Sequence, residues 1–500
     1  MLNKTRISRW VIRNLPLLSF LIPYFILTVV AQFVYASSYS GWWLRLLNRD
    51  IDLAEFSTLF SFGYWLLLLL PFAVAPPIFV ATRRFAAPIF KKLAHTVPEF
   101  TRGEYVIAAA ACYAFVIYSF ASSDIIGRWG HGAGALDAVD ARFQILDLLG
   151  YWPRMVLQSP LIFLSIYALV RALRSREAFW WISCLINFFL MTSLLILLGM
   201  KWPVLVFYIG LVVAIFANAR KRPYLGATFG STLVMASYLA ISVVVLRVVP
   251  PPPLPSIEIA QKPTETSKPR KAEQNVPATD KAISEREPSL KAAPGGEPPP
   301  LKSVAPKPSG ALPPSDIRQS HWGKFLRDMT TEAIDKAPIL VAVALDRMAL
   351  PYMYYYEIFT TEGAVCGGIW AQLERGKKCR PSLLVYERMF EDRFAGRGTA
   401  PQAVHIAAYA IGGWSAAIVA LILASVILGL FAALSLYENA TWGTAYVMGS
   451  LAGYFFSQLS GEWVIFYDHA IIWWVALLLA IYILRCACNK WLPPEQRANR

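Results

Sequence analysis

The chain has 500 residues, of which 56% are hydrophobic and only 16% are charged, and its mean hydropathy is +0.46. Soluble globular domains carry about 25% charged residues, so this composition excludes a soluble fold. The net charge of +15 falls mostly in short loops between apolar runs, as the positive-inside rule predicts for membrane proteins. This placement argues against nucleic acid as a partner.

Apolar runs recur down the chain and predict an all-α polytopic membrane protein with about ten transmembrane helices. The expected spans are 15–35, 57–82, 105–124, 154–171, 179–199, 202–218, 225–248, 403–433, 443–464 and 467–486. Seven of them form an N-terminal bundle over 1–248, and three form a C-terminal bundle with a tail over 403–500. Because the basic segments then fall on one side, both termini are expected in the cytoplasm and residues 249–402 outside it.

The large outer loop has two parts of different composition. Residues 249–318 hold 17 of the chain's 34 prolines, interleaved with charged and small residues, which predicts a disordered linker or, alternatively, a partner-binding arm. Residues 319–402 are aromatic and mixed in charge, so they are expected to fold and to cap the outer mouth of the bundle. Within them, 337–359 is expected to be an amphipathic helix that lies on or dips into the outer surface, because Arg347 and Pro351 interrupt the apolar run. A further membrane crossing by the same residues is the alternative.

Cys366 and Cys379 are the only cysteine pair in the outer loop. An oxidising compartment outside the cytoplasm would join them across a short, turn-rich stretch, so a disulfide is expected. Two free thiols remain the alternative.

Positive charge also occurs on the expected outer face, where the positive-inside rule makes it scarce. The residues are Arg128, His131, Arg142, Arg154, Lys201, Arg347, Arg388, Arg393 and Arg397. Arg154 and Lys201 flank Trp-Pro pairs that open two spans, and helix N-termini with added cations favour anions such as phosphate. Snorkelling of both side chains to lipid headgroups is the alternative. The sequence has no metal-ligand cluster and no phosphate-binding loop, so neither a metal nor a cofactor is predicted.

Tyrosines follow Arg347 closely. Tyr352, Tyr354 and Tyr355 can stack on sugar rings in an outer pocket, which predicts sugar binding. An aromatic belt at the membrane interface is the alternative interpretation of the same residues.

Three stretches resemble the bacterial O-antigen polymerases (Wzy-type oligosaccharide repeat-unit polymerases). "LLGMKWPVLVFYIGLVVAIFANARKR" is similar to the family's span that a basic residue opens, one span before a large periplasmic loop. "LDRMALPYMYYYEIF" resembles the Arg- and Tyr-rich part of that loop, and "GTAPQAVHIAAYAIGGWSAAIVALILASVILG" resembles the loop exit. The proline-rich linker departs from the usual pattern, and His405 does not reproduce the His-Asn motif of the related ligases.

The resemblance implies a bacterial inner-membrane glycosyltransferase that polymerises polyprenyl-pyrophosphate-linked repeat units on the periplasmic face without a metal. Its implied partners are these lipid-linked glycans, the lipid bilayer, a chain-length regulator and a flippase. In the implied mechanism arginines stabilise the departing pyrophosphate. The catalytic candidates are Arg347, Lys201 and Glu357, the last as general base with Glu462 as an alternative. The further candidates for the pyrophosphate are Arg128, Arg154, Arg393 and Arg397.

Two other functions remain open from the sequence. Asp50 and Asp52 in the first outer loop would suit another kind of polytopic lipid-sugar glycosyltransferase that uses an acidic pair. A non-enzymatic transporter or envelope scaffold would use the proline-rich arm as a tether. Transporters usually carry charges inside their spans or internal repeats, and neither feature stands out here.

Overall fold

The computed structural model describes residues 9–36, 56–93, 97, 99–123, 125, 144–198, 201–218, 228–233, 236–237, 345, 349–361, 363, 381–390, 399–434 and 436–458. All of them belong to the unit formed by residues 1–249 and 335–500. This part of the chain is mostly helical and contains no β-strand, which confirms the predicted all-α class for the described residues.

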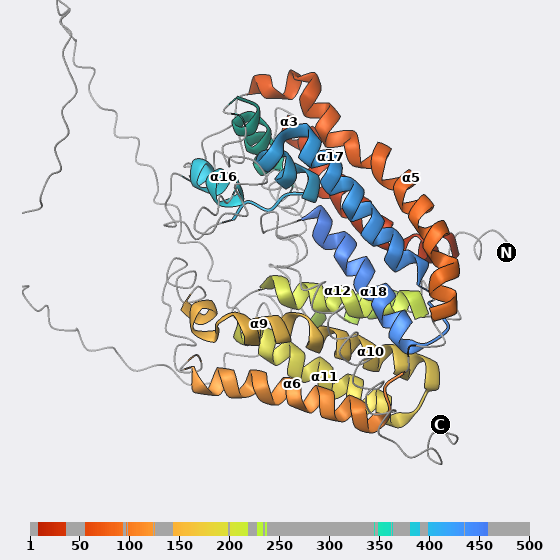
Figure 1. Cartoon of the computed structure of the whole chain (residues 1–500). Helices are drawn as coiled ribbons and strands as arrows, with labels where there is room; N and C mark the ends of the chain where they lie inside the picture. The colour runs from red at the N-terminus through yellow and green to blue at the C-terminus, as the bar shows by residue number, and fades with distance from the viewer. Residues whose placement is uncertain are drawn as a thin grey trace, which may run out of the picture. The chain divides into compact units, whose positions relative to one another are not determined.

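The N-terminal half contributes most of the helices (Figure 1). The first span consists of α2 (Leu15–Tyr24), the π-helix η1 (Phe25–Val30) and α3 (Ala31–Ala36). The short 3-10 helix η2 (Phe56–Phe60) precedes the long α5 (Phe62–Leu93). The helices that follow are α6 (Arg102–Ser122), α9 (Tyr151–Gln158), α10 (Pro160–Ser175), α11 (Ala178–Leu197) and α12 (Lys201–Asn218).

The described residues in the second half of the chain contribute further helices. Residues 349–361 form a helix, and α16 (Pro381–Phe390) follows it. The last two described helices are α17 (Val404–Ala433) and α18 (Ala440–Ser457).

Among the described residues, six helices are long and apolar enough to cross a membrane, so the chain is a multi-pass membrane protein. They are Leu15–Tyr35, Phe62–Lys92, Arg102–Ser122, Tyr151–Ser175, Ala178–Leu197 and Val404–Ala433, and each overlaps one of the ten predicted spans. Pro203–Asn218 is apolar but shorter. Most of the predicted span 225–248 and all of 467–486 lie outside the described residues, so the full count of ten stays a prediction.

Polar contacts gather the ends of several helices at one end of this unit, which we call the basic end. Arg83, near the end of α5, donates to Asn14 Oδ1 (2.7 Å) at the start of α2. Arg102, the first residue of α6, pairs with Glu177 before α11 (2.8 Å). Arg174, near the end of α10, donates to Asn218 Oδ1 at the end of α12 (3.1 Å) and to the Leu436 carbonyl after α17.

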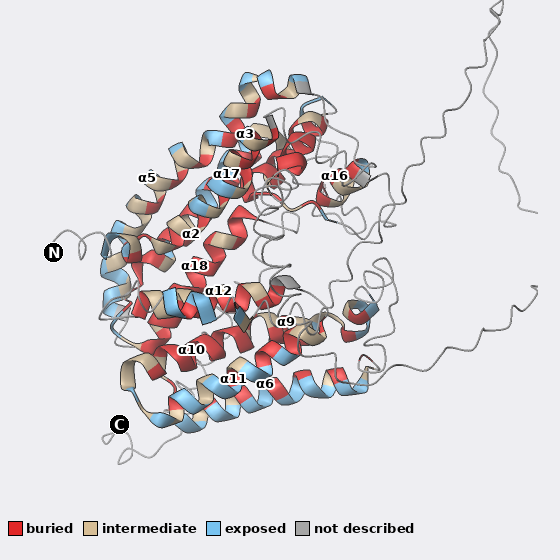
Figure 2. Ribbon diagram, turned by 180° about the vertical axis from the view of Figure 1, so that it is seen from behind, coloured by how far each residue is buried: buried red, intermediate tan, exposed pale blue. Residues whose placement is uncertain are grey.

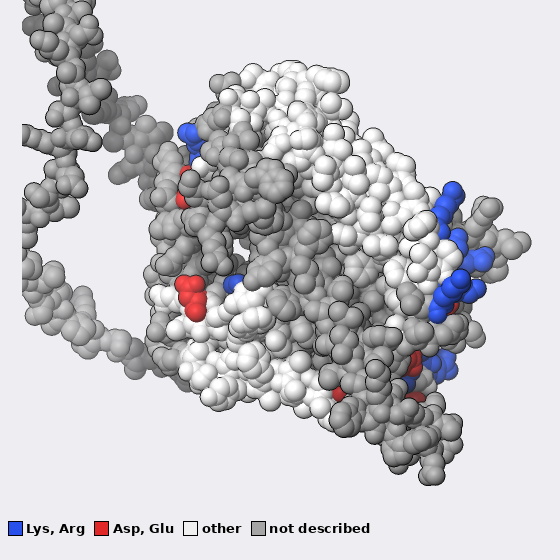
Figure 3. Space-filling view, in the orientation of Figure 1, with Lys and Arg blue, Asp and Glu red and all other residues white. Residues whose placement is uncertain are grey.

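Figure 3 shows Lys and Arg side chains gathered at this end, with a broad uncharged surface beside them. The helices joined there therefore alternate in direction, as expected for successive membrane crossings. The first residues of α5, α9, α12 and α17 lie at the opposite end of the unit, where the views of Figures 1 and 2 agree.

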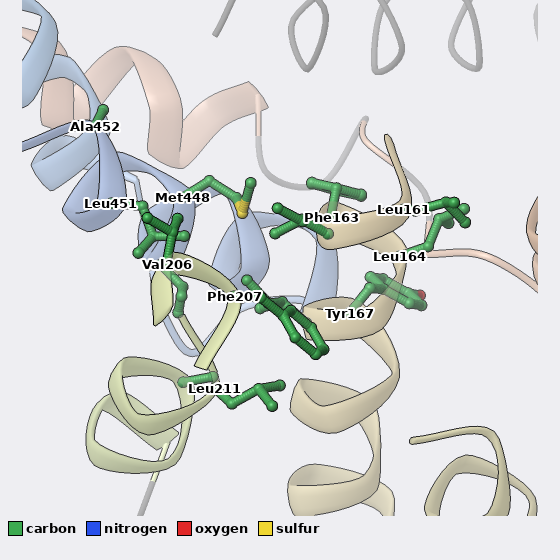
Figure 4. Packing of buried hydrophobic residues seen from close by; sticks show 14 of the residues in the cluster. Leu161, Phe163, Leu164, Tyr167, Val206, Phe207, Leu211, Met448, Leu451 and Ala452 are labelled. Atoms are coloured by element: carbon green, nitrogen blue, oxygen red, sulfur yellow. The ribbon is translucent and has the colours of Figure 1, made fainter. Parts of the chain in front are cut away.

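The apolar core lies where α10, α12 and α18 meet. Phe163 and Tyr167 of α10, Phe207 of α12, and Met448 and Leu451 of α18 are fully or almost fully buried and interlock there (Figure 4). Such interlocking at near-crystalline density gives the dispersion contacts that hold helices together in lipid. We use the name apolar core for these five residues.

Small residues let α18 approach its neighbours closely. A Cβ at Gly453 would overlap the Pro16 carbonyl of α2, and one at Gly449 would overlap the Phe431 side chain of α17. The outward faces of α5, α6 and α11 are exposed and apolar, as Figure 2 shows. Exposed residues of this kind suit contact with lipid tails.

Candidate functional site

The helix 349–361 is buried inside the unit rather than lying on its surface. Ala349, Leu350, Tyr352, Met353 and Tyr355 are all at most 1% exposed. The sequence predicts an amphipathic surface helix over 337–359, whereas the described part of that range packs with the first span, the start of α5 and the start of α17. Pro351 lies within the helix and does not break it.

Three tyrosine hydroxyls of this helix, those of Tyr352, Tyr355 and Tyr356, bond groups on other segments, which offsets the cost of burying them. Tyr352 Oη donates to the Tyr64 carbonyl of α5 (2.5 Å), and Tyr355 Oη donates to the Ala400 carbonyl before α17 (3.3 Å). Tyr356 Oη lies 2.9 Å from Ser61 Oγ. Burial raises the pKa of the Tyr352 hydroxyl well above its usual value, so this group stays protonated as a donor.

A polar stripe on the first span faces this helix. Tyr24, Thr28 and Gln32 recur every four residues and are all at most 1% exposed. Gln32 Nε2 donates to the Ala349 carbonyl (2.9 Å), and its Oε1 accepts from Tyr64 Oη. The stripe crosses the π-helix η1, and π-helical turns are enriched at functional sites.

His405, in the first turn of α17, lies beside Tyr24 of this polar stripe. Its side chain is fully buried, and its Nε2 lies 3.2 Å from the Leu67 carbonyl and 3.4 Å from Tyr24 Oη. Tyr24 Oη itself donates to the Leu68 carbonyl (2.8 Å). Because a carbonyl can only accept, the contact with Leu67 assigns the proton to Nε2 and leaves Nδ1 as an acceptor.

Two buried polar atoms of this group have no hydrogen-bond partner within the described part of the chain. They are His405 Nδ1 and Thr28 Oγ1. An orphaned buried polar atom costs about 1–3 kcal/mol, so such atoms are candidates for contact with water or a ligand. We call the whole group the polar seam, and it consists of Tyr24, Thr28, Gln32, Tyr64, Tyr352 and His405.

The helix α17 is broken just beyond the seam. Gly413 has φ 66° and ψ −155°, a backbone conformation that is essentially restricted to glycine, and it separates a first segment starting at Val404 from the long remainder of α17. Discontinuous membrane helices commonly border binding sites, because a break frees backbone groups to contact a ligand.

The structure describes some of the predicted site residues and leaves others outside. Tyr352, Tyr354 and Tyr355 are buried, and Glu357 is half-buried on the same helix. Arg154 is half-buried in α9, and Lys201 is the first residue of α12. Their roles stay predictions. The predicted residues outside the described parts are Asp50, Asp52, Arg128, Arg347, Cys366, Cys379, Arg393, Arg397 and Glu462.

No described ring among Tyr352, Tyr354 and Tyr355 offers a solvent-exposed face, since none is more than 4% exposed. In this conformation they anchor the helix rather than form a membrane belt. Sugar stacking by these rings stays a prediction. Among the described residues no cluster of His, Cys, Asp or Glu has the composition to hold a metal ion.

Sequence reasoning did not include Tyr24, Thr28, Gln32 and Tyr64 in a site. A signal was present in the first span, where "YFILTVVAQ" places polar residues four apart within an otherwise apolar run. Residues four apart share a helix face, and a polar face on a membrane helix normally points into the protein. Comparison with protein-family models, with curated proteins and with solved structures found no match for this chain.

Proposed function

We propose that this multi-pass membrane protein is an inner-membrane glycosyltransferase that polymerises polyprenyl-pyrophosphate-linked repeat units on the periplasmic face. One observation carries the proposal: the helix 349–361, which the sequence assigns to the predicted large outer loop, is built into the bundle among the first span, α5 and α17. A loop that only tethers or spaces has no need for such burial. A loop that completes a reaction site needs a fixed position, because positioning supplies much of the rate enhancement.

The location of this helix supports the proposal. Tyr352 bonds the Tyr64 carbonyl at the start of α5, and α5 ends at the basic end. The helix therefore lies toward the opposite end, together with the starts of α9 and α12, which carry Arg154 and Lys201. Under the positive-inside rule the end opposite the basic residues faces away from the cytoplasm. Arg347 precedes the helix by two residues in the sequence, so the proposal assigns it to the same end.

In the proposed reaction the cations stabilise the pyrophosphate that leaves the donor glycan. A hydroxyl of the acceptor sugar attacks the anomeric carbon, the bond from that carbon to the pyrophosphate oxygen breaks, and a base takes the hydroxyl proton. Glu357 is the proposed base. The pyrophosphate leaves with its negative charge held by Arg347 and Lys201.

The test uses a strain that lacks the protein, complemented with wild type, with Arg347→Ala or with the matched control Arg176→Asn. Arg176 lies at the basic end in a left-handed conformation that Asn tolerates. Gel electrophoresis of the surface polysaccharide is expected to show long chains with wild type and with the control. Arg347→Ala is expected to leave single repeat units on the surface. If Arg347→Ala restores the full ladder, the assignment of Arg347 is wrong.

The polar seam favours a second candidate, a transporter for lipid-linked or small polar substrates. A buried histidine within a span, a π-helix and a broken helix are features of transport proteins. The same strain separates the two functions, because loss of a transporter leaves repeat units inside the cell. Labelling of surface sugars on intact cells therefore gives single units for a missing polymerase and no signal for a missing transporter.

A further inference from the structure

The cations at the basic end fall into two sets that differ in their partners. In the first set, Arg102 pairs with Glu177, Arg171 pairs with Glu99, and Arg174 binds Asn218 and the Leu436 carbonyl. These contacts hold loops and helix ends together. We call these three residues the paired cations; Arg176 lies beside them in the sequence and is exposed.

The second set lies where α2 begins and α5 ends. Residues 9–14 and 83–93 contain six Lys and Arg side chains and no Asp or Glu. Among the described residues no carboxylate forms an ion pair with Arg13, Arg84, Lys91 or Lys92, and all four are exposed. We call these four residues the unpaired basic patch, and Figure 3 shows Lys and Arg atoms gathered at this edge of the molecule.

Arg83 assembles this patch from two distant segments. Its guanidinium donates to Asn14 Oδ1 (2.7 Å) and to the Arg13 carbonyl (3.2 Å), and it lies 5.5 Å from the centre of the Phe79 ring. The start of α2 is therefore fixed beside α5 at Arg83, ten residues before α5 ends at Leu93. Fixing like charges side by side is unfavourable unless an anion lies near them.

Exposed apolar side chains adjoin the cations. Phe85 is 77% exposed and Ile89 is 48% exposed, and they share a face of α5 with Lys92 at a spacing of four and seven residues. Arg84 and Lys91 lie on the neighbouring face, seven residues apart. In the segment just before the first span, Trp10 is 59% exposed and lies three residues from Arg13. Cations beside outward-facing rings match a molecule that is anionic at its head and apolar in its tail.

We propose that the unpaired basic patch is a binding site for anionic phospholipid headgroups of the membrane, with Phe85 and Ile89 in contact with the acyl chains. The site needs no residue of the polar seam and is independent of the proposed glycosyl transfer. Charge complementarity selects the anionic lipid, since a zwitterionic lipid offers no net charge to four cations.

The test titrates the purified full-length protein, in an uncharged detergent, with dioctanoyl phosphatidylglycerol and with dioctanoyl phosphatidylcholine. Each basic side chain near an anionic lipid surface contributes roughly fivefold to affinity. The double variant Arg84→Gln/Lys91→Gln is therefore expected to bind phosphatidylglycerol about 25-fold more weakly, and Lys91→Gln alone about fivefold. The matched control Arg102→Gln/Arg176→Asn removes the same charge from the basic end outside the patch and is expected to bind like wild type.

Circular dichroism and elution volume verify that each variant is folded. Equal affinity for the two lipids would overturn the proposal, and so would an equal loss of affinity in the patch variant and the control. Inorganic phosphate is added at the concentration at which phosphatidylglycerol saturates the protein. If phosphate displaced the lipid at that concentration, the patch would be a site for free anions, and this result too would overturn the proposal.

Discussion

The apolar core and the polar seam are both fully buried, but they hold helices together by different means. In the apolar core, Phe207 and its neighbours interlock mainly by shape, and the Tyr167 hydroxyl accepts from the Phe100 N–H (2.9 Å). In the polar seam, Tyr352 and Gln32 reach backbone carbonyls of segments far away in the sequence. The comparison shows that spans can be assembled by packing, whereas a loop helix with polar side chains needs matched acceptors to enter the same interior.

The seam also differs from the core in carrying unsatisfied atoms. All side-chain atoms of Phe207, Met448 and Leu451 are apolar, so burial leaves nothing unpaired. His405 Nδ1 and Thr28 Oγ1 have no partner within the described residues. Such atoms lower stability, so His405 Nδ1 and Thr28 Oγ1 are the positions of the seam that have bonding capacity left for water or a ligand.

The largest expected effect is in the apolar core. Phe207→Ala would leave a cavity between α10, α12 and α18 and is expected to lower the free energy of unfolding by about 3–5 kcal/mol. Reversible unfolding in mixed micelles measures this. Phe189→Ala removes the same ring from a lipid-facing position that is 60% exposed, and its effect should stay below about 0.5 kcal/mol. Equal effects of the two changes would contradict the assignment of the core.

A smaller effect is expected in the polar seam. Tyr352→Phe removes only the hydroxyl that donates to the Tyr64 carbonyl, so the expected loss is about 1 kcal/mol. The same unfolding measurement applies, with Tyr118→Phe as the control because Tyr118 is 72% exposed. If Tyr352→Phe leaves stability unchanged while Tyr118→Phe lowers it, the bond between the loop helix and α5 is not part of the fold.

The smallest effect on stability is expected at His405. His405→Leu loses the contact with the Leu67 carbonyl but also removes the orphaned Nδ1, and these changes offset each other to within about 1 kcal/mol. Reversible unfolding in mixed micelles measures this small difference. A stability loss as large as that of Phe207→Ala would instead make His405 a packing residue.

The sequence alone predicted the spans better than the site. Six expected spans became long apolar helices, because hydrophobic length is a local property that a short window of sequence reveals. The burial of residues 349–361 was not predicted. It depends on acceptors at Tyr64 and Ala400, which are distant in the sequence, and on Gln32 of the first span.

The residue types of the helix 349–361 did not reveal its buried position. Pro351 and the neighbouring charges of 345–348 argued for a surface location, although Pro351 is accommodated within the helix. Single tyrosines are as common at a membrane interface as in a binding site, so their type did not decide between the two. Only the partners of their hydroxyls do so, and those partners depend on the tertiary structure.

The central claim is that the outer-loop helix 349–361 is an interior part of the membrane bundle at the end opposite the basic residues. Single cysteines at Ala349 and Thr361, in a protein without native cysteines, test it by labelling intact cells with a membrane-impermeant maleimide. Ala349 is fully buried and Thr361 is exposed on the same helix. The account predicts rapid labelling of Thr361→Cys from outside and none of Ala349→Cys. Equal labelling at both positions, or labelling of Thr361→Cys only after the cells are opened, would contradict it.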